Sequence, residues 1–176
     1  PRSSSAASDV YKRQIRAIVA GCQSAPAVNA WFDAKTMTRQ LHDKIDLGIA
    51  VNTEEGLFVP VLRDVAHRYA EDLQQALERL KADVAARTIP PQELRGQTIT
   101  LSNFGAIAGR FATMVVVPPQ VAILGAGRIT RRIVAVDDQA TVHKILPLSL
   151  TFDHRAVTGG EAAQFLAAAI ADLERS

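Results

Sequence analysis

The stretch DLGIAVNTEEGLFVPVL, residues 46–62, holds the clearest hairpin signal in the sequence. Two apolar runs, Leu47–Val51 and Leu57–Leu62, flank NTEEG, a turn that contains glycine, and this pattern predicts a β-hairpin. A helical pattern follows the hairpin, and most of the chain after it is strand-like. Because that order does not repeat the strand–helix–strand unit, a doubly wound parallel sheet is disfavoured.

Three segments have a helical pattern. IRAIVAGCQSAP (15–26) predicts a helix that ends before Pro26, since the residue before a proline avoids the helical conformation. HRYAEDLQQALERLKADVAAR (67–87) predicts an amphipathic helix, and an alanine-rich helix closes the chain from residue 160 or 161. The apolar positions of the second helix recur at spacings of three and four and are expected to face the core: Tyr69, Leu73, Leu77, Leu80 and Val84.

The other segments predict strands. VNAWFD (28–33) is short, TITLS (98–102) alternates, and two β-branched runs around Pro118–Pro119 are expected to be buried strands. Residues 131–152 predict a hairpin that turns at 137–139 and has a long second arm. The expected fold is therefore α/β: a two-layer sandwich in which helices cover one face of a mixed β-sheet.

The first 14 residues, PRSSSAASDVYKRQ, differ in texture from the rest. They are polar and serine-rich, lack a clear period, and resemble translated adapter or cloning sequence. Residues 1–14 are therefore predicted to be a non-native or disordered leader, with a genuine flexible arm as the alternative. The globular domain is expected to cover residues 15–176.

Composition limits the class of protein. The 176 residues are 48% hydrophobic and 22% charged, with a net charge of +2, which fits one globular domain. The charges form no basic stripe, so no nucleic-acid partner is expected, and no apolar run approaches the length of about 18 residues that predicts a membrane span. The single cysteine, Cys22, excludes an internal disulfide framework and fits a reducing compartment.

TFDHRAVTGG, residues 151–160, places a histidine just after a strand that is expected to be buried. An imidazole has an unperturbed pKa near 6.5 and can take and return a proton near neutral pH, so His154 is a candidate general base. Gly159 and Gly160 allow a tight turn and an unobstructed helix start. The sequence gives His154 no partner, and a structural histidine at a strand end is the alternative.

TITLSNFGAIAG, residues 98–109, brings a hydroxyl to the end of a strand. Ser102 there can donate a hydrogen bond to a developing oxyanion, and losing one such donor typically costs about 3 kcal/mol in the transition state. The alternative is that the Ser102–Asn103 pair and Gly105 only make a turn.

Two other patterns favour structure over chemistry. GAGRIT (125–130) has only Gly-x-Gly and no following helix, so it is not expected to bind a dinucleotide. Asp137, Asp138 and His143 fall in a predicted hairpin, and a solvated turn is favoured over a metal site. No metal ligand set is therefore predicted.

Four motifs follow one another in the chain: LGIAVNTEEGLFVPVLRD (47–64), GQTITLSNFGAIAG (96–109), PPQVAILGAGRI (118–129) and DHRAVTGGEAAQFL (153–166). Together they resemble the catalytic domain of dihydrolipoyl acyltransferases, the core component of 2-oxo-acid dehydrogenase complexes. The similarity runs from about Ile15 to Ser176. Chloramphenicol acetyltransferase shares the fold and the catalytic histidine, but the hairpin and PPQVAILG favour the complex core.

The resemblance implies the coenzyme A-dependent acyltransferase fold and transfer of an acyl group between a dihydrolipoyl thiol and coenzyme A. His154 would take the proton from the thiol, and Ser102 of a neighbouring subunit would hold the oxyanion. Asn103, Gly105 and Arg155 become candidate contacts for the substrate or coenzyme A. The lipoyl group would come from a separate domain that this chain does not include.

The resemblance also implies partners and a location. The family forms homotrimers that build larger cages, and further domains bind the decarboxylase and dihydrolipoyl dehydrogenase components. The expected location is the bacterial cytoplasm, or the mitochondrial matrix in a eukaryote. The acyl group could be acetyl, succinyl or branched-chain, with acetyl or branched-chain slightly favoured.

Two features depart from the family pattern. Thr158 stands where the signature usually has an aspartate, four residues after the histidine, and we expect it to brace the loop rather than tune the imidazole. The domain also lacks its usual first segment, so 15–176 is expected to be partial and weakly active or inactive alone. A non-catalytic assembly scaffold and an O-acetyltransferase of the chloramphenicol type are the alternative functions.

Overall fold

A five-stranded mixed sheet forms the centre of the computed structural model, which describes residues 4–175, and side chains from residue 9 onwards. The strand order is β11-β8-β7-β3-β6. β7 is parallel to both of its neighbours, whereas β11–β8 and β3–β6 are antiparallel pairs. The predicted mixed sheet is confirmed, and its strands are β3 (Leu47–Ile49), β6 (Val61–Leu62), β7 (Ile99–Ser102), β8 (Ala122–Ala126) and β11 (Leu148–Phe152).

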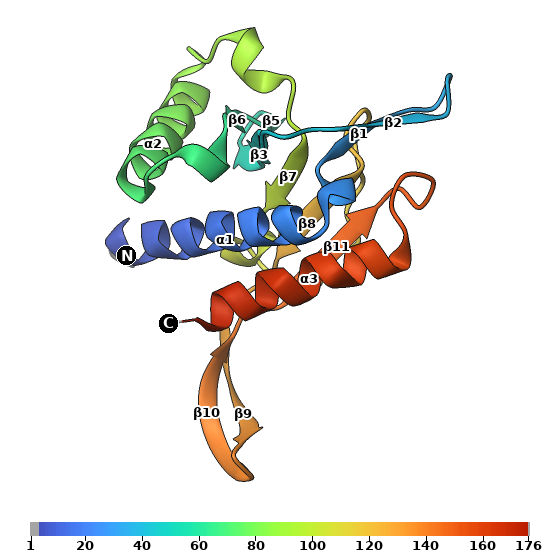
Figure 1. The fold of residues 1–176 in the computed structure, drawn as a ribbon. Helices are drawn as coiled ribbons and strands as arrows, with labels where there is room; N and C mark the ends of the chain where they lie inside the picture. Colours follow the sequence, from blue (N-terminus) through green and yellow to red (C-terminus); the bar gives the residue numbers. More distant parts are fainter. Residues whose placement is uncertain (1–3, 176) are drawn as a thin grey trace.

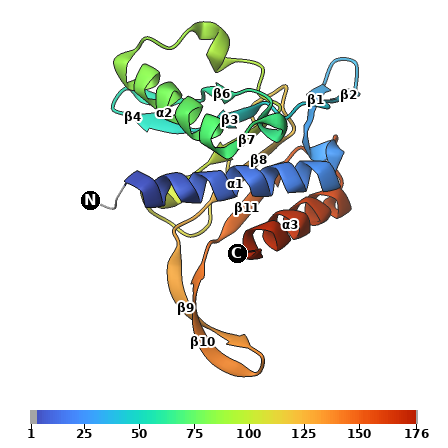
Figure 2. The ribbon, with the colours of Figure 1, turned by 60° about the vertical axis from the view of Figure 1, so that its left-hand side comes forward.

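Helices cover one face of this sheet, as predicted (Figures 1 and 2). α1 and α3 lie side by side across it, and α2 packs near the β6 edge. The buried face of α2 holds the four expected residues from Leu73 to Val84, but Tyr69 is 84% exposed. Tyr69 precedes the first helical residue, so it does not share the helix's core-facing side and its predicted place in the core is wrong. The helices are α1 (Ser4–Ser24), α2 (Ala70–Ala86) and α3 (Gly159–Glu174).

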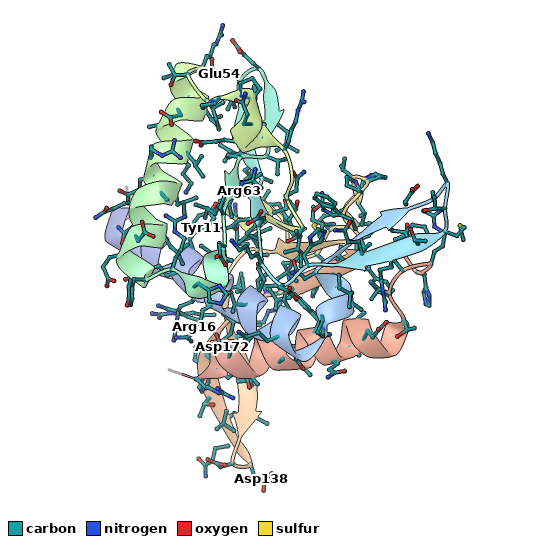
Figure 3. The ribbon with its side chains drawn as sticks, turned by 45° about the horizontal axis from the view of Figure 1, so that its top comes forward. Tyr11, Arg16, Glu54, Arg63, Asp138 and Asp172 are labelled. Carbon is teal, nitrogen blue, oxygen red and sulfur yellow. The ribbon has the colours of Figure 1, made fainter. Side chains whose placement is uncertain are left out.

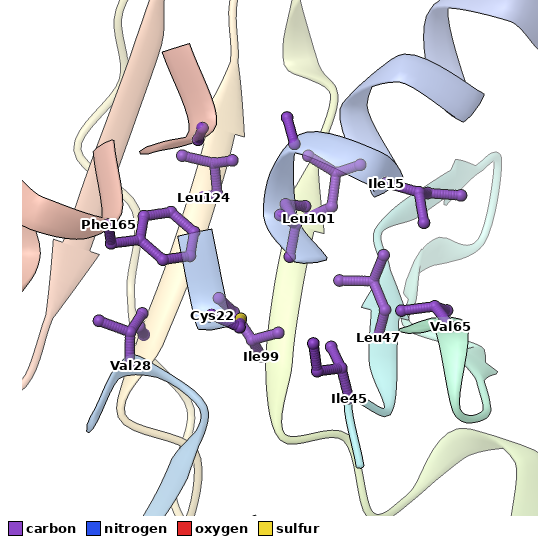
Figure 4. Packing of buried hydrophobic residues seen from close by; sticks show 14 of the residues in the cluster. Ile15, Cys22, Val28, Ile45, Leu47, Val65, Ile99, Leu101, Leu124 and Phe165 are labelled. Atoms are coloured by element: carbon purple, nitrogen blue, oxygen red, sulfur yellow. The ribbon is translucent and has the colours of Figure 1, made fainter. Parts of the chain in front are cut away.

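α1 and α3 approach closely at one glycine. A Cβ added to Gly21 would lie 2.6 Å from the Phe165 ring, which is fully buried between the helices and the sheet (Figure 4). Arg16 and Asp172 join the same two helices by an ion pair of 2.7 Å near their solvent side (Figure 3). The layer over the sheet is thus held by apolar contact inside and by charge at its rim.

Three hairpins form separate two-stranded sheets outside the central one. The predicted hairpin at 46–62 is present but divides at Ala50, so that β3 pairs with β6 while β4 pairs with β5. The hairpin of β9 and β10 is also present, and it projects from the body with Asp137 and Asp138 at its tip (Figures 1 and 3). These strands are β1 (Ala30–Asp33), β2 (Thr38–Leu41), β4 (Val51–Thr53), β5 (Gly56–Phe58), β9 (Thr130–Val136) and β10 (Gln139–Ile145).

Two strand predictions need correction. The long second arm of the last hairpin is two strands, because the chain leaves β9 near Pro147, which has no N–H to donate, and β11 then joins β8. The first β-branched run, Met114–Val117, is extended but pairs with no strand among the described residues, and Val115 is 81% exposed. Its side chains alternate between half-buried and exposed, which is the pattern of an unpaired edge.

The segment before Ile15 continues α1 from Ser4. Residues 1–3 lie outside the described residues, so the predicted leader is only partly visible here. Gln14 is buried, and among the residues whose side chains are described neither atom of its side-chain amide has a hydrogen-bond partner. That residues 1–14 are a non-native leader stays a prediction. Within residues 4–175, every helix is too short or too polar to cross a lipid bilayer.

Candidate active site

The loop that carries His154 is anchored on both sides of the histidine. The Asp153 amide donates to the Val121 carbonyl at 2.8 Å as the chain leaves β11, and the amides of Ala156 and Val157 both donate to the Asp153 carbonyl. Val157 is fully buried, whereas the imidazole of His154 is exposed and lies 5.4 Å from the Phe152 ring, centroid to centroid. The backbone is therefore fixed while the imidazole is presented to solvent.

The side chains of Arg155 and Asp153, which flank His154 in the sequence, are hydrogen-bonded to each other. The Nε of Arg155 donates to Oδ1 of Asp153 at 2.9 Å, and Nη2 donates to Oδ2 at 2.6 Å. These bonds hold the pKa of the Asp153 carboxyl below its usual value. The guanidinium also lies over the Phe32 ring at 4.8 Å from its centroid. Arg155 thus has intramolecular partners, and its contact with coenzyme A stays a prediction.

Thr158 caps the helix that follows the loop. Its hydroxyl accepts from the Glu161 amide at 3.2 Å, and its own amide donates to the Glu161 carboxylate at 2.7 Å. This reciprocal pair is a capping box. Hydrogen bonds from Thr158 also lower the pKa of Glu161. The geometry favours bracing as the role of Thr158, because its hydroxyl is engaged with α3.

Ser102 ends β7 on the sheet face opposite the helices. It pairs with Gly125, and its neighbours Ile99 and Leu101 point into the helical layer, so alternation turns Thr100 and Ser102 the other way. A cavity of about 550 Å³ opens there, with Ser102 in its wall. Its polar walls come from Gln97, Thr100 and Gln120, and no charged residue lines it among those described. The apolar walls include Leu57, Phe58, Val59, Met114, Val115 and Val117.

The loop after Ser102 is seated by glycines. Asn103 leads into a 3₁₀ turn, Phe104–Ala106, and a Cβ added to Gly105 would lie 2.1 Å from the carbonyl carbon of Gly127. Gly105 is therefore required for backbone packing, whatever it contacts in a ligand. In GAGRIT, β8 ends at Ala126 and β9 begins at Thr130, so the motif connects two strands. The predicted turn at Asp137 and Asp138 is confirmed.

The two candidate catalytic residues lie at opposite ends of the sheet. On β8, Ser102 pairs beside Gly125, whereas Phe152, two residues before His154, pairs beside Ala122. Three residues along a strand and two strands across correspond to roughly 10 Å in each direction. His154 lies farther still, beyond the end of β11. One chain therefore does not bring the imidazole and the hydroxyl together.

Sequence reasoning missed two parts of the site. The apolar segment 111–117 crosses the Ser102 face, where the amide of Met114 reaches the Thr151 hydroxyl at 3.4 Å, and its two-residue alternation was the available signal. Arg39 donates to the Ala156 carbonyl in the histidine loop, a contact for which the local sequence carries no signal.

Known proteins resemble this chain over most of its length. A lipoamide acyltransferase component of the branched-chain alpha-keto acid dehydrogenase complex from Pseudomonas putida is 38% identical over 92% of the chain. The chain spans 38% of that relative. The cubic core of a pyruvate dehydrogenase multienzyme complex superposes with a TM-score of 0.89 at 28% identity, covering 94% of this chain and 68% of that one.

A third relative has been studied for its mechanism. The dihydrolipoamide acetyltransferase of Azotobacter vinelandii is 27% identical, with a TM-score of 0.89 and coverage of 94% of this chain and 68% of that one. That study concerned the role of a serine, a histidine and an asparagine in catalysis. A chloramphenicol acetyltransferase, at 16% identity and a TM-score of 0.56, shares the fold only. The model of the 2-oxoacid dehydrogenase acyltransferase catalytic domain matches residues 4–175, and the chain belongs to that family.

Proposed function

We propose that the protein transfers an acyl group between a dihydrolipoyl thiol and coenzyme A. The observation that carries this proposal is the pair of half-sites on one chain: an exposed imidazole on a fixed loop, and a hydroxyl in the wall of an apolar cavity. The A. vinelandii enzyme supports the assignment. Its serine lies 52 positions before its histidine and its asparagine four after it, the same spacing that relates Ser102, His154 and Thr158.

Each half-site has a defined chemical task. His154 removes the proton from the attacking thiol, which at an unperturbed pKa near 8.5 is only a few per cent thiolate at pH 7. The thiolate sulfur attacks the thioester carbonyl carbon, and Ser102 donates a hydrogen bond to the resulting oxyanion. The tetrahedral intermediate then collapses, the C–S bond to the second sulfur breaks, and the imidazolium returns its proton to that departing thiolate.

A second copy of the chain completes the site. His154 of one subunit meets Ser102 of the next, which is why the separation within one chain does not prevent catalysis. Exposed apolar side chains around the cavity mouth, Leu57, Val115 and Val117, supply surface for that contact. The assembly is a homotrimer that builds a larger cage.

The substrates and partners follow from the family. Coenzyme A and a lipoyl group carried on another domain are the two thiol substrates. The decarboxylase and dihydrolipoyl dehydrogenase components are the partner enzymes. The place of work is the bacterial cytoplasm or, in a eukaryote, the mitochondrial matrix, because relatives include bacterial proteins and a mitochondrial succinyltransferase component.

The cavity supports an uncharged acyl group. A buried succinyl carboxylate would need a cationic partner, because a buried charge left without its partner costs about 3–5 kcal/mol. The described walls offer amide and hydroxyl groups but no Arg, Lys or His. Acetyl or branched-chain acyl groups therefore fit better than succinyl, and turnover of acetyl-, isobutyryl- and succinyl-coenzyme A by the assembled protein tests this ranking.

Mixed assemblies test the proposed function most directly. His154→Ala and Ser102→Ala subunits should each be inactive as pure assemblies. When unfolded together and reassembled in equal amounts, they should recover about a quarter of the wild-type acyl exchange, because a random ring pairs an intact histidine with an intact serine at that frequency. Full activity of pure His154→Ala would overturn the proposal in favour of a different mechanism. An inactive wild-type assembly of the native-length protein would favour the scaffold.

A further inference from the structure

One face of the β1–β2 hairpin holds the loop that carries His154. Phe32 and Arg39 are direct cross-strand partners in this hairpin, so their side chains share a face. Arg155 lies over the Phe32 ring, and Nη1 of Arg39 donates to the carbonyl of Ala156. The hairpin thus contacts the two residues that directly follow the histidine.

The same arginine reaches the helix cap. Nη1 of Arg39 lies 3.6 Å from Oε1 of Glu161, and the other carboxylate oxygen of Glu161 accepts from both the amide and the hydroxyl of Thr158. One guanidinium therefore connects the loop backbone, through Ala156, to the first turn of α3, through Glu161. Both connections start on a strand that lies more than a hundred residues earlier in the chain.

We propose that Arg39 is a positioning residue for His154, which fixes the imidazole by tying the Ala156 carbonyl and the Glu161 carboxylate to the β1–β2 hairpin. The inference rests on the proposed function for its kinetic consequence, whereas its effect on the loop can be measured independently. Thr158 carries no charge, and the only charged side chain in the capping box is Glu161. Arg39 supplies the positive charge opposite it.

We expect Arg39 to contribute to the placement of His154 rather than to the free energy of unfolding. The side chains of Arg39 and Glu161 are each about one-third exposed (35% and 32%), and ion pairs at such sites add little to the free energy of unfolding. Placement matters more for a general base, because a displacement of about 1 Å can cost on the order of 100-fold in rate. The bond from Arg39 to the Ala156 carbonyl ties the histidine loop to β2, the second strand of the hairpin.

Hydrogen exchange in the 176-residue chain tests the restraint without any assay of activity. Arg39→Met should speed exchange of the Ala156 and Val157 amides, which bond to the Asp153 carbonyl, by about tenfold, while amides of β8 stay unchanged. Lys35→Met, which removes an exposed cation from the same hairpin, is the matched control and should leave the loop amides as they are. Unchanged loop exchange in Arg39→Met would overturn the proposal.

Kinetics of the assembled protein separate positioning from folding. Arg39→Met should lower kcat by about tenfold with little change in the KM for coenzyme A, and Arg39→Lys should restore part of kcat because it keeps the charge opposite Glu161. A drop in melting temperature with kcat unchanged would mean a merely structural role and would refute the proposal. If Arg39→Met does not fold, amide exchange and kcat are measured on Arg39→Lys instead, and smaller changes in both are expected. If His154→Ala is fully active, the proposed function fails, while the exchange result still decides the restraint.

Discussion

The two loops that supply His154 and Ser102 are held in opposite ways. The histidine loop is hydrogen-bonded to Val121 just before β8, to the β1–β2 hairpin and to α3, while its imidazole is exposed. The serine loop packs closely at the backbone of Gly105 and then runs into an extended segment whose side chains alternate between half-buried and exposed. Within residues 4–175, the histidine loop is held by contacts of its own chain, whereas segment 111–117 beside Ser102 pairs with no strand. We therefore expect the serine side to depend more on a neighbouring subunit.

The largest effect should come from the histidine. His154→Ala should reduce acyl exchange by about 10³-fold, the usual scale for a lost general base, with no change in melting temperature because the imidazole is exposed. His143→Ala, an exposed histidine on β10, should leave both quantities unchanged. A large loss of stability in His154→Ala would show that the loop is less independent of its imidazole than we describe.

Substitutions at Gly105 and Gly159 compare how closely the backbone is packed in the two loops. Gly105→Ala should destabilise the protein by about 1–3 kcal/mol, because the new methyl group meets the Gly127 backbone, which cannot rotate away. Gly159→Ala, at the start of α3, meets nothing within 4 Å and should be nearly neutral. Denaturant unfolding measures both, and equal costs would break the contrast between the loops.

The helix cap should show a smaller effect. Thr158→Ala should cost about 1 kcal/mol of unfolding free energy through loss of the bond to the Glu161 amide, whereas Thr158→Asp should keep an acceptor for that amide. If Thr158 only braces the loop, kcat of Thr158→Asp should equal that of wild type. A marked rise in its kcat would instead indicate that a carboxylate at this position tunes the imidazole.

The smallest effect should be the pH dependence of stability that comes from His42, the residue after β2. Partial burial lowers the pKa of His42 below its ordinary 6.5, against the opposing charges of Asp46 and Asp43. As the pH falls below about 6.5, the unfolded chain binds a proton that the folded chain resists, so stability decreases down to the folded pKa and is fully present above 6.5. His42→Gln should flatten the melting temperature between pH 7 and pH 5, whereas His143→Gln should not.

Local patterns predicted the elements better than their partners. Alternation and turn residues located β7 and the β9–β10 hairpin, and the three-and-four spacing of Leu73 to Val84 located α2. The Met114–Val117 run was misassigned because a β-branched run signals an extended backbone, not the strand that pairs with it. His154 and Ser102 were found as motifs. Arg39 was not, because its contact spans 117 residues and only the folded hairpin creates it.

The placement of His154 and Ser102 at opposite ends of the sheet determines how many active sites an assembly of a given size can contain. If His154 and Ser102 meet across subunits, as proposed above, a working site exists only at a junction between copies. An open row of subunits would then always have one site fewer than it has members. A dimer with one such junction leaves an unused imidazole at one end and an unused hydroxyl at the other. Only a closed ring gives every copy its own site, and head-to-tail closure is therefore the condition for full specific activity.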